Sequence, residues 1–195
     1  MQAAALAKSW KRSSAGIPAG VLAWLKLASG QSWDYSGRMS LKELRIITVG
    51  KPHDFWKEAG EHYLERIARF RKVTESIIKD SDPALPTARR VEEEGKRILA
   101  ALGPQDIPVC LDEKGRSMTS REFSRFLDGL STDGTRRPCF IVGGPFGLHD
   151  SVRDKAKHLI AFGPQTFPHE LARVVLLEQL YRAESLLRNM PYHHD

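Results

Sequence analysis

The sequence has 195 residues, of which 41% are hydrophobic and 28% charged, and its formal net charge is +6. This length suffices for one domain with a core, and no apolar run approaches the roughly 18 residues of a membrane-spanning helix. The two cysteines, Cys110 and Cys139, fall in predicted strands and have no ligand spacing with histidines. We therefore expect buried thiols in a reducing compartment, with no disulfide and no metal site.

Residues 1–38 differ in composition from the rest of the chain. They carry five lysines or arginines against one acidic residue, a net charge of +4 that leaves about +2 for the remainder. We consider three interpretations: a disordered tail or mis-assigned start ahead of Met39, a mitochondrial or plastid transit peptide, and a secretory signal, which the short apolar core disfavours. We expect the domain to comprise residues 39–195 and to be cytoplasmic, unless residues 1–38 are a transit peptide.

From Leu44 onward, short apolar segments alternate with segments of helical periodicity. The predicted strands cover residues 44–49, 73–78, 107–111, 139–142 and 159–162, and the predicted helices 54–71, 87–102, 119–130, 148–157 and 169–188. Asp54 is a candidate N-cap, Thr119 and Glu122 form a capping box, and residues 112–115 are expected to turn out of the third strand. This alternation predicts an α/β fold, a mostly parallel sheet with helices on both faces.

Two of the predicted helices carry surfaces that bear on binding partners. The last helix is apolar on more than one face, which indicates that it is buried or packs against a partner, and a homodimer is the natural inference. The first helix has a basic face, which we interpret as solvated, with an RNA contact as the alternative. Its members are Lys57, Arg66, Arg69, Arg71 and Lys72.

Two glycine-rich loops follow the last two predicted strands. Residues 143–147 read G-G-P-F-G, and residues 163–168 read G-P-Q-T-F-P. In an open α/β sheet, ligands bind beyond the carboxyl ends of strands, and glycine lets the backbone approach them closely. The loops lack the dinucleotide and P-loop fingerprints. They are either ordinary turns or a ligand cradle of another geometry.

Three ordered motifs carry a family resemblance: I-V-G-G-P-F-G-L at 141–148, F-P-H-E-L-A-R-V-V-L-L-E-Q-L-Y-R-A at 167–183 and N-M-P-Y-H-H at 189–194. Together they resemble the ribosomal RNA large subunit methyltransferase H family. The resemblance implies a SPOUT-class α/β domain with a C-terminal trefoil knot, and a homodimer with active sites at the subunit interface. It also implies methylation of N3 of a pseudouridine in 23S rRNA of the ribosome, with S-adenosylmethionine as methyl donor.

The same resemblance implies the residues that bind this cofactor. They are an apolar contact at the end of the third strand, the glycine of the first loop and the six residues of an adenine-binding loop: Leu111, Gly143, Phe162, Gly163, Pro164, Gln165, Thr166 and Phe167. Phe146 departs from the family, since an acidic residue is common at its place.

Four residues of the matching motifs are candidates for catalysis: His169, Arg182, Tyr192 and His193. The N3 imide must lose or share a proton before it attacks a methyl group, so a base or a cation beside the anion would serve. His169 either is catalytic or has an N-cap or other structural role. Arg182 either stabilises the imide anion or forms a salt bridge with Glu178. Tyr192 and His193 belong to a tail that we expect to close over the nucleotide.

Two other functions stay open at this point. One is a SPOUT methyltransferase with a different RNA base or ribose as its target. The other is a non-catalytic RNA-binding factor of ribosome assembly, against which an intact cofactor loop argues.

Overall fold

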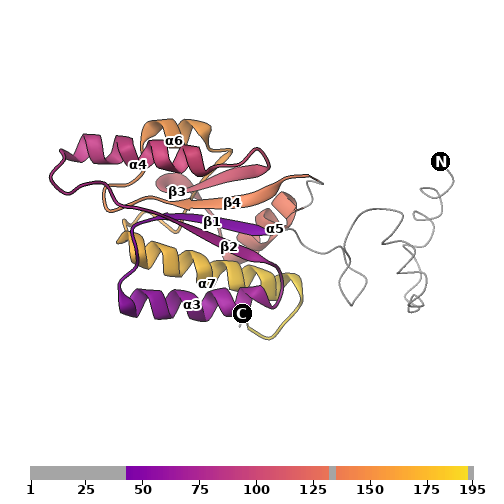
Figure 1. Ribbon diagram of the computed structural model, residues 1–195. Coiled ribbons are helices and arrows are strands. Elements are labelled where there is room, and N and C mark those ends of the chain that lie inside the picture. Colours follow the sequence, from indigo (N-terminus) through magenta and orange to yellow (C-terminus); the bar gives the residue numbers. More distant parts are fainter. Residues whose placement is uncertain (1–42, 132–134, 193–195) are drawn as a thin grey trace, which may run out of the picture. The chain divides into compact units, whose positions relative to one another are not determined.

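A computed structural model describes residues 43–131 and 135–192 of the chain. In this part the strands form one parallel sheet in the order β2-β1-β4-β3-β5 (Figure 1). The strands are β1 (Leu44–Val49), β2 (Val73–Ile78), β3 (Asp106–Ser117), β4 (Arg137–Val142) and β5 (His158–Ala161). The predicted fold class is confirmed, whereas the trefoil knot stays a prediction. The division of the chain at residue 38 also stays a prediction, because residues 1–42 lie outside the described ranges.

Helices cover both faces of this sheet. Helices α3 (Asp54–Ala68), α5 (Ser120–Ser131) and α7 (His169–Leu187) pack on one face, and α4 (Thr87–Ala101) and α6 (Asp150–Lys155) pack on the other (Figure 1). Within the described ranges, no helix combines the length and apolar composition that crossing a bilayer requires.

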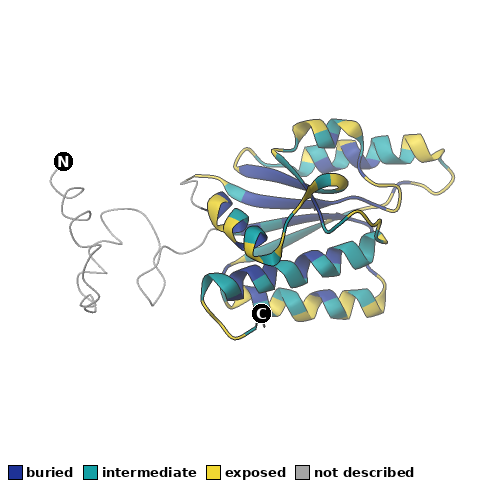
Figure 2. Ribbon diagram, turned by 180° about the vertical axis from the view of Figure 1, so that it is seen from behind, coloured by how far each residue is buried: buried dark blue, intermediate teal, exposed yellow. Residues whose placement is uncertain are grey.

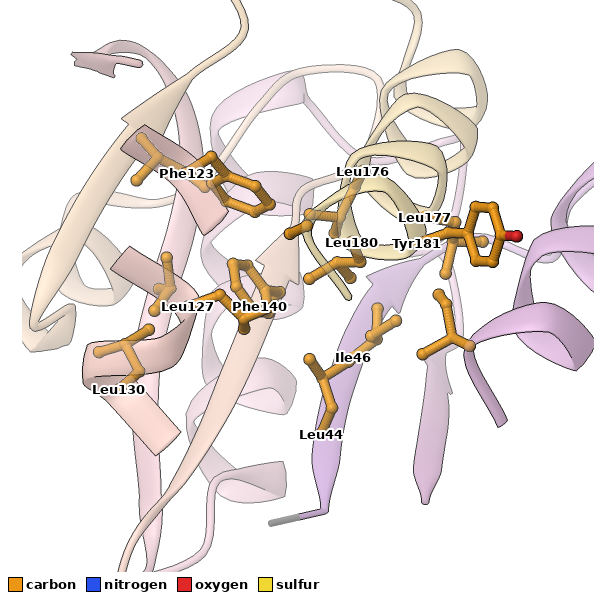
Figure 3. Close-up of a cluster of buried hydrophobic side chains, with 14 of the residues drawn as sticks. Leu44, Ile46, Phe123, Leu127, Leu130, Phe140, Leu176, Leu177, Leu180 and Tyr181 are labelled. Carbon is orange, nitrogen blue, oxygen red and sulfur yellow. The ribbon is translucent and has the colours of Figure 1, made fainter. Parts of the chain in front are cut away.

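Alternate residues of the central strands feed two separate cores. Ile46 and Phe140 belong to the core under α3, α5 and α7, whereas Ile47 and Ile141 belong to the core under α4 and α6. In the first core, Phe140 lies among side chains of α5 and α7 (Figure 3). Successive strand residues point to opposite faces, so a sheet covered on both sides buries most residues of its central strands β1 and β4. Figure 2 shows this as buried strands between helices with exposed outer surfaces.

Two of the local predictions at helix starts have different outcomes. The capping box is confirmed, since Glu122 Oε2 accepts from the Thr119 backbone N–H at 2.8 Å and Thr119 Oγ1 accepts from the Glu122 N–H at 3.3 Å. Asp54 is not an N-cap. His53, which has an extended backbone, occupies that position, and Asp54 is the first helical residue. There its negative charge interacts favourably with the positive end of the helix dipole.

The third strand continues past the turn that the sequence predicts. Leu111 and Arg116 both pair with Ile160, so residues 112–115 leave the ladder as a bulge and then rejoin it. Gly115 lies so close to the backbone of Ile160 that a Cβ atom would stand 2.5 Å from it. This bulge, rather than a strand end, presents Asp112 and Glu113 at the carboxyl edge of the sheet.

Arg71 corrects the expectation of a solvated basic face. Its side chain is fully buried, and its Nε lies 2.5 Å from Oε1 of the equally buried Glu184 of α7. Its Nη1 also donates to Ser131 Oγ of α5 at 3.0 Å. Burial lowers the pKa of Arg71, and the neighbouring Glu184 carboxylate counters that shift. Arg71 therefore ties the end of α3 to α5 and α7.

Replacing Glu184 with alanine should lower the free energy of unfolding by about 3–5 kcal/mol, because Arg71 would keep a buried charge without its carboxylate. Urea denaturation at one fixed protein concentration measures this loss. Glu61→Ala is the matched control, since it breaks the exposed Lys57–Glu61 pair. That variant should lose less than about 1 kcal/mol. Equal losses for the two variants would contradict the structural importance of the buried pair.

Candidate functional site

A cavity of about 350 Å³ lies at the carboxyl ends of β4 and β5, beside the bulge of β3. Its wall is formed by residues 111–113, by residues 142–148 after β4 and by most of residues 160–167 around the end of β5. Arg153 of α6, with His169 and Ala172 of α7, completes the wall. The volume suits a small ligand, and the place is the one where open α/β sheets bind theirs.

The loop after β4 is a tight turn that needs its glycines. Gly147 donates its N–H to Gly144 O at 3.0 Å and has a positive φ of 79°. A Cβ atom on Gly143 would stand 2.8 Å from the carbonyl group of Gly147. Glycine at 143 therefore allows the turn to close beside the cavity, and it leaves backbone facing a ligand.

The loop after β5 supplies apolar walls and a second backbone segment. Five of the six residues expected to bind adenine line the cavity. The sixth, Pro164, is exposed and does not line it. Gly163 has a positive φ of 122°, a conformation that favours glycine. Leu111, Phe162 and Phe167 give this cavity apolar sides, which suit a base such as adenine.

Carboxylates of the β3 bulge form the polar side of the cavity. Asp112 accepts from Arg153 Nε at 2.6 Å and from the Lys114 N–H at 3.0 Å. Burial acts to raise the pKa of Asp112, but these hydrogen bonds outweigh it and hold the pKa below its ordinary value. Glu113 accepts from Thr166 Oγ1 at 3.1 Å, which links the bulge to the loop after β5. These carboxylates give a cationic ligand favourable surroundings.

No motif in the sequence pointed to Asp112, Glu113 or Arg153 as residues of the site, and residues 112–115 were expected to form a turn. Two acidic residues immediately after an apolar strand were the available signal, because the end of a parallel strand faces the ligand edge of the sheet.

His169 lies at the cavity, in the first position of α7. Its interpretation as an N-cap is wrong, because Pro168 holds that position without a capping side chain. His169 and Asp80 both lie next to Gly50. A Cβ atom on Gly50 would be 3.2 Å from His169 Nε2 and 2.9 Å from Asp80 Oδ1. The first turn of α7 thus meets the carboxyl ends of β1 and β2.

Arg182 and Tyr192 lie together, but away from the cavity of their own chain. Arg182 Nη2 is 2.5 Å from Glu178 Oε1, so the expected salt bridge is present. The Tyr192 hydroxyl donates to the same oxygen at 3.3 Å, and its ring packs edge-on against Tyr181. Arg182 follows Ala172 by ten residues, and a helix rises about 1.5 Å per residue, so the two lie about 15 Å apart along α7. His193 lies outside the described residues.

The surroundings of Tyr192 determine what its hydroxyl can do. Burial and hydrogen bonding to Tyr63 and Glu178 raise the pKa of Tyr192 to about 12. The guanidinium of Arg182 lies 5.0 Å from the centre of the ring. The phenol therefore stays neutral near pH 7 and can donate a hydrogen bond or stack, but it is not a base.

Among the residues that the structure describes, no three His, Cys, Asp or Glu side chains are grouped so that they could hold a metal ion.

Comparison with known proteins gives consistent matches over this domain. A family model described as "Predicted SPOUT methyltransferase" matches residues 42–193. Ribosomal RNA large subunit methyltransferase H of Nitratidesulfovibrio vulgaris strain DP4 is 54% identical over 156 residues, which are 80% of this chain and 100% of the relative. The protein of the same name from Lawsonia intracellularis is 55% identical over 157 residues, again 80% of this chain and 100% of the relative. The chain therefore belongs to the SPOUT methyltransferases and, within them, to the ribosomal RNA large subunit methyltransferase H family.

Proposed function

We propose that this protein transfers a methyl group from S-adenosylmethionine to N3 of a pseudouridine in 23S rRNA of the large ribosomal subunit. The observation that carries the proposal is the cavity at the carboxyl ends of β4 and β5, beside the bulge of β3. Seven of the eight residues that the family resemblance assigns to the cofactor line it, although they come from three separate segments of the chain.

The residues of this cavity fit the proposed cofactor. Leu111, Phe162 and Phe167 would enclose the adenine, and the glycine turns at 143 and 163 would offer backbone groups to its edge. The carboxylates of Asp112 and Glu113 would favour the positively charged part of the molecule. Bound there, S-adenosylmethionine supplies an electrophilic methyl group on a sulfonium centre.

The chain supplies the groups that make the imide nitrogen a nucleophile. Holding the base in line with the methyl group would provide much of the rate. The permanent charge of Arg182 would stabilise the imide anion. His169 or His193 would take the proton, since histidine is the side chain that exchanges protons near neutral pH.

The separation of Arg182 from the cavity supports a homodimer in which each site uses both copies. Arg182 and Tyr192 would then act in the cavity of a second copy, with α7 at the interface. The half-buried apolar residues of α7, among them Leu171, Val174 and Val175, provide a surface for such contact. With an rRNA substrate, the protein would work in the cytoplasm, or in an organelle if residues 1–38 are a transit peptide.

Methyl transfer from labelled S-adenosylmethionine tests the substrate. Ribosomes that lack this modification, free 23S rRNA and bulk tRNA are offered side by side to the full-length protein. We expect label in 23S rRNA of the ribosomes, and its loss when the pseudouridine is replaced by uridine, which lacks the additional ring N–H. Label in tRNA would favour another SPOUT activity. Cofactor binding without any transfer would favour a non-catalytic RNA-binding factor.

Gly143→Ala tests the cofactor site. Its new Cβ would meet the Gly147 carbonyl at 2.8 Å and displace the turn. Overpacking of this kind costs about 1–3 kcal/mol, so the Kd for S-adenosylmethionine should rise about tenfold or more by calorimetry. Gly129→Ala in α5 is the control, because its Cβ would meet nothing within 4 Å. Unchanged affinity in Gly143→Ala would place the cofactor elsewhere.

Mixing two impaired variants, at a concentration of S-adenosylmethionine well below the raised Kd of Gly143→Ala, tests whether the site is shared between copies. One variant is Arg182→Ala and the other carries the cofactor-site change Gly143→Ala. If each site combines the cavity of one copy with Arg182 of the other, half of the randomly mixed dimers have one intact site. The mixture should then regain about a quarter of the wild-type activity. A mixture as inactive as its two parents would show that each chain acts alone.

A further inference from the structure

Phe146 is a large apolar side chain that stays exposed at the mouth of the cavity. Its side chain is 47% exposed, and it lines the cavity beside the loop glycines. It stands inside the turn closed by the hydrogen bond from Gly147 N to Gly144 O, so its backbone is fixed. A ring held in this way offers a flat surface on which another planar group can stack.

Arg90 of α4 adds a positive charge to this ring. Its guanidinium lies 4.9 Å from the centre of the Phe146 ring. The other arginines of α4 are paired, Arg89 with Glu92 at 2.9 Å and Arg97 with Glu93 at 3.1 Å. Within the described ranges Arg90 makes no ion pair, and its buried Nε has no hydrogen-bond partner. Its charge is therefore available to an anion.

We propose that Phe146 and Arg90 bind the nucleotide next to the methylated one, the ring stacking on its base and the guanidinium pairing with its phosphate. This inference rests on the proposed function. A base that reaches a methyl group inside a cavity must leave its stack, and its neighbour then loses a stacking partner. Aromatic rings and guanidinium planes are the groups that proteins use to hold such unstacked RNA bases. The pair thus selects single-stranded RNA at the cavity mouth.

Steady-state kinetics of methyl transfer to unmodified ribosomes, together with calorimetry of S-adenosylmethionine binding, test this role. Phe146→Leu keeps an apolar side chain but removes the stacking surface. Its KM for ribosomes should rise about tenfold, as expected when one base loses an aromatic partner. The Kd for S-adenosylmethionine should stay within about twofold of the wild-type value. Phe146→Tyr should restore the KM.

Arg90→Gln tests the phosphate contact separately. Loss of one such contact should make the salt dependence of kcat/KM shallower by about one unit of its logarithmic slope. Phe55→Leu is the matched control, because Phe55 is 71% exposed on α3 and does not line the cavity. As the control for Phe146→Leu, this variant should change neither the KM for ribosomes nor the Kd for S-adenosylmethionine.

The outcomes separate this inference from the proposed function. A wild-type protein that transfers no methyl group to ribosomes would overturn both. An active wild type with an unchanged KM in Phe146→Leu would overturn only the nucleotide site. A rise in the Kd for S-adenosylmethionine in Phe146→Leu would instead assign Phe146 to the cofactor and would equally overturn it.

Discussion

The position of α7 against the sheet is the constraint on which the rest of the molecule depends. Three leucines of α7, Leu176, Leu177 and Leu180, are fully buried. Apolar contact is not directional, so by itself it would let the helix slide or rotate on the sheet. Directional contacts fix it at both ends. Near its start, Arg173 forms a bidentate salt bridge with Glu75 of β2, in which Nε and Nη2 donate to the two carboxylate oxygens at 2.6 and 2.7 Å. The same guanidinium occupies the space that a Cβ atom of Gly60 would need. Near its end, Glu184 pairs with Arg71. Buried charges of this kind tolerate few alternative arrangements, so the helix has one position and one orientation on the sheet.

The fixed position of α7 connects the two groups of candidate catalytic residues, His169 at the cavity and Arg182 with Tyr192. The first turn of α7 brings His169 to the cavity, and Glu170 in the same turn accepts from the His53 backbone N–H at 2.7 Å at the start of α3. The second half of the helix holds Arg182 beside Tyr192. A rigid helix therefore keeps these groups at a constant separation, with Arg182 outside the wall of its own chain's cavity. That rigidity is the physical reason to look for a second copy of the chain.

The sequence predicted regular elements well and their long-range contacts poorly. The bounds of β1 and β2 match the prediction. β1 is a mostly apolar, β-branched run that ends before Gly50, and β2 is rich in β-branched residues and ends before the polar Lys79. The two glycine-rich loops that line the cavity were also located, since glycine at a strand end is a local signal. Arg71 was misplaced because its burial depends on Glu184, which lies 113 positions later. The bulge at residues 112–115 depends in the same way on pairing with β5, which follows β3 in the chain. Local patterns carry no information about such partners.

The electrostatics of the described residues narrow the search for the proton acceptor. Tyr192 is excluded, because its pKa is raised to about 12 and its hydroxyl already donates to Glu178. The pKa of Asp112 is lowered by its bonds to Arg153, so its carboxylate is a weak base that is already committed as an acceptor. The guanidinium of Arg182 can stabilise an anion but cannot take a proton, and the hydrogen bonds that it donates to Glu178 raise its pKa further. Under the proposed function, the imide proton would then leave to a histidine of the site or to water. The chain would contribute mainly position and positive charge, which suits a weakly acidic nitrogen that needs only its anion stabilised.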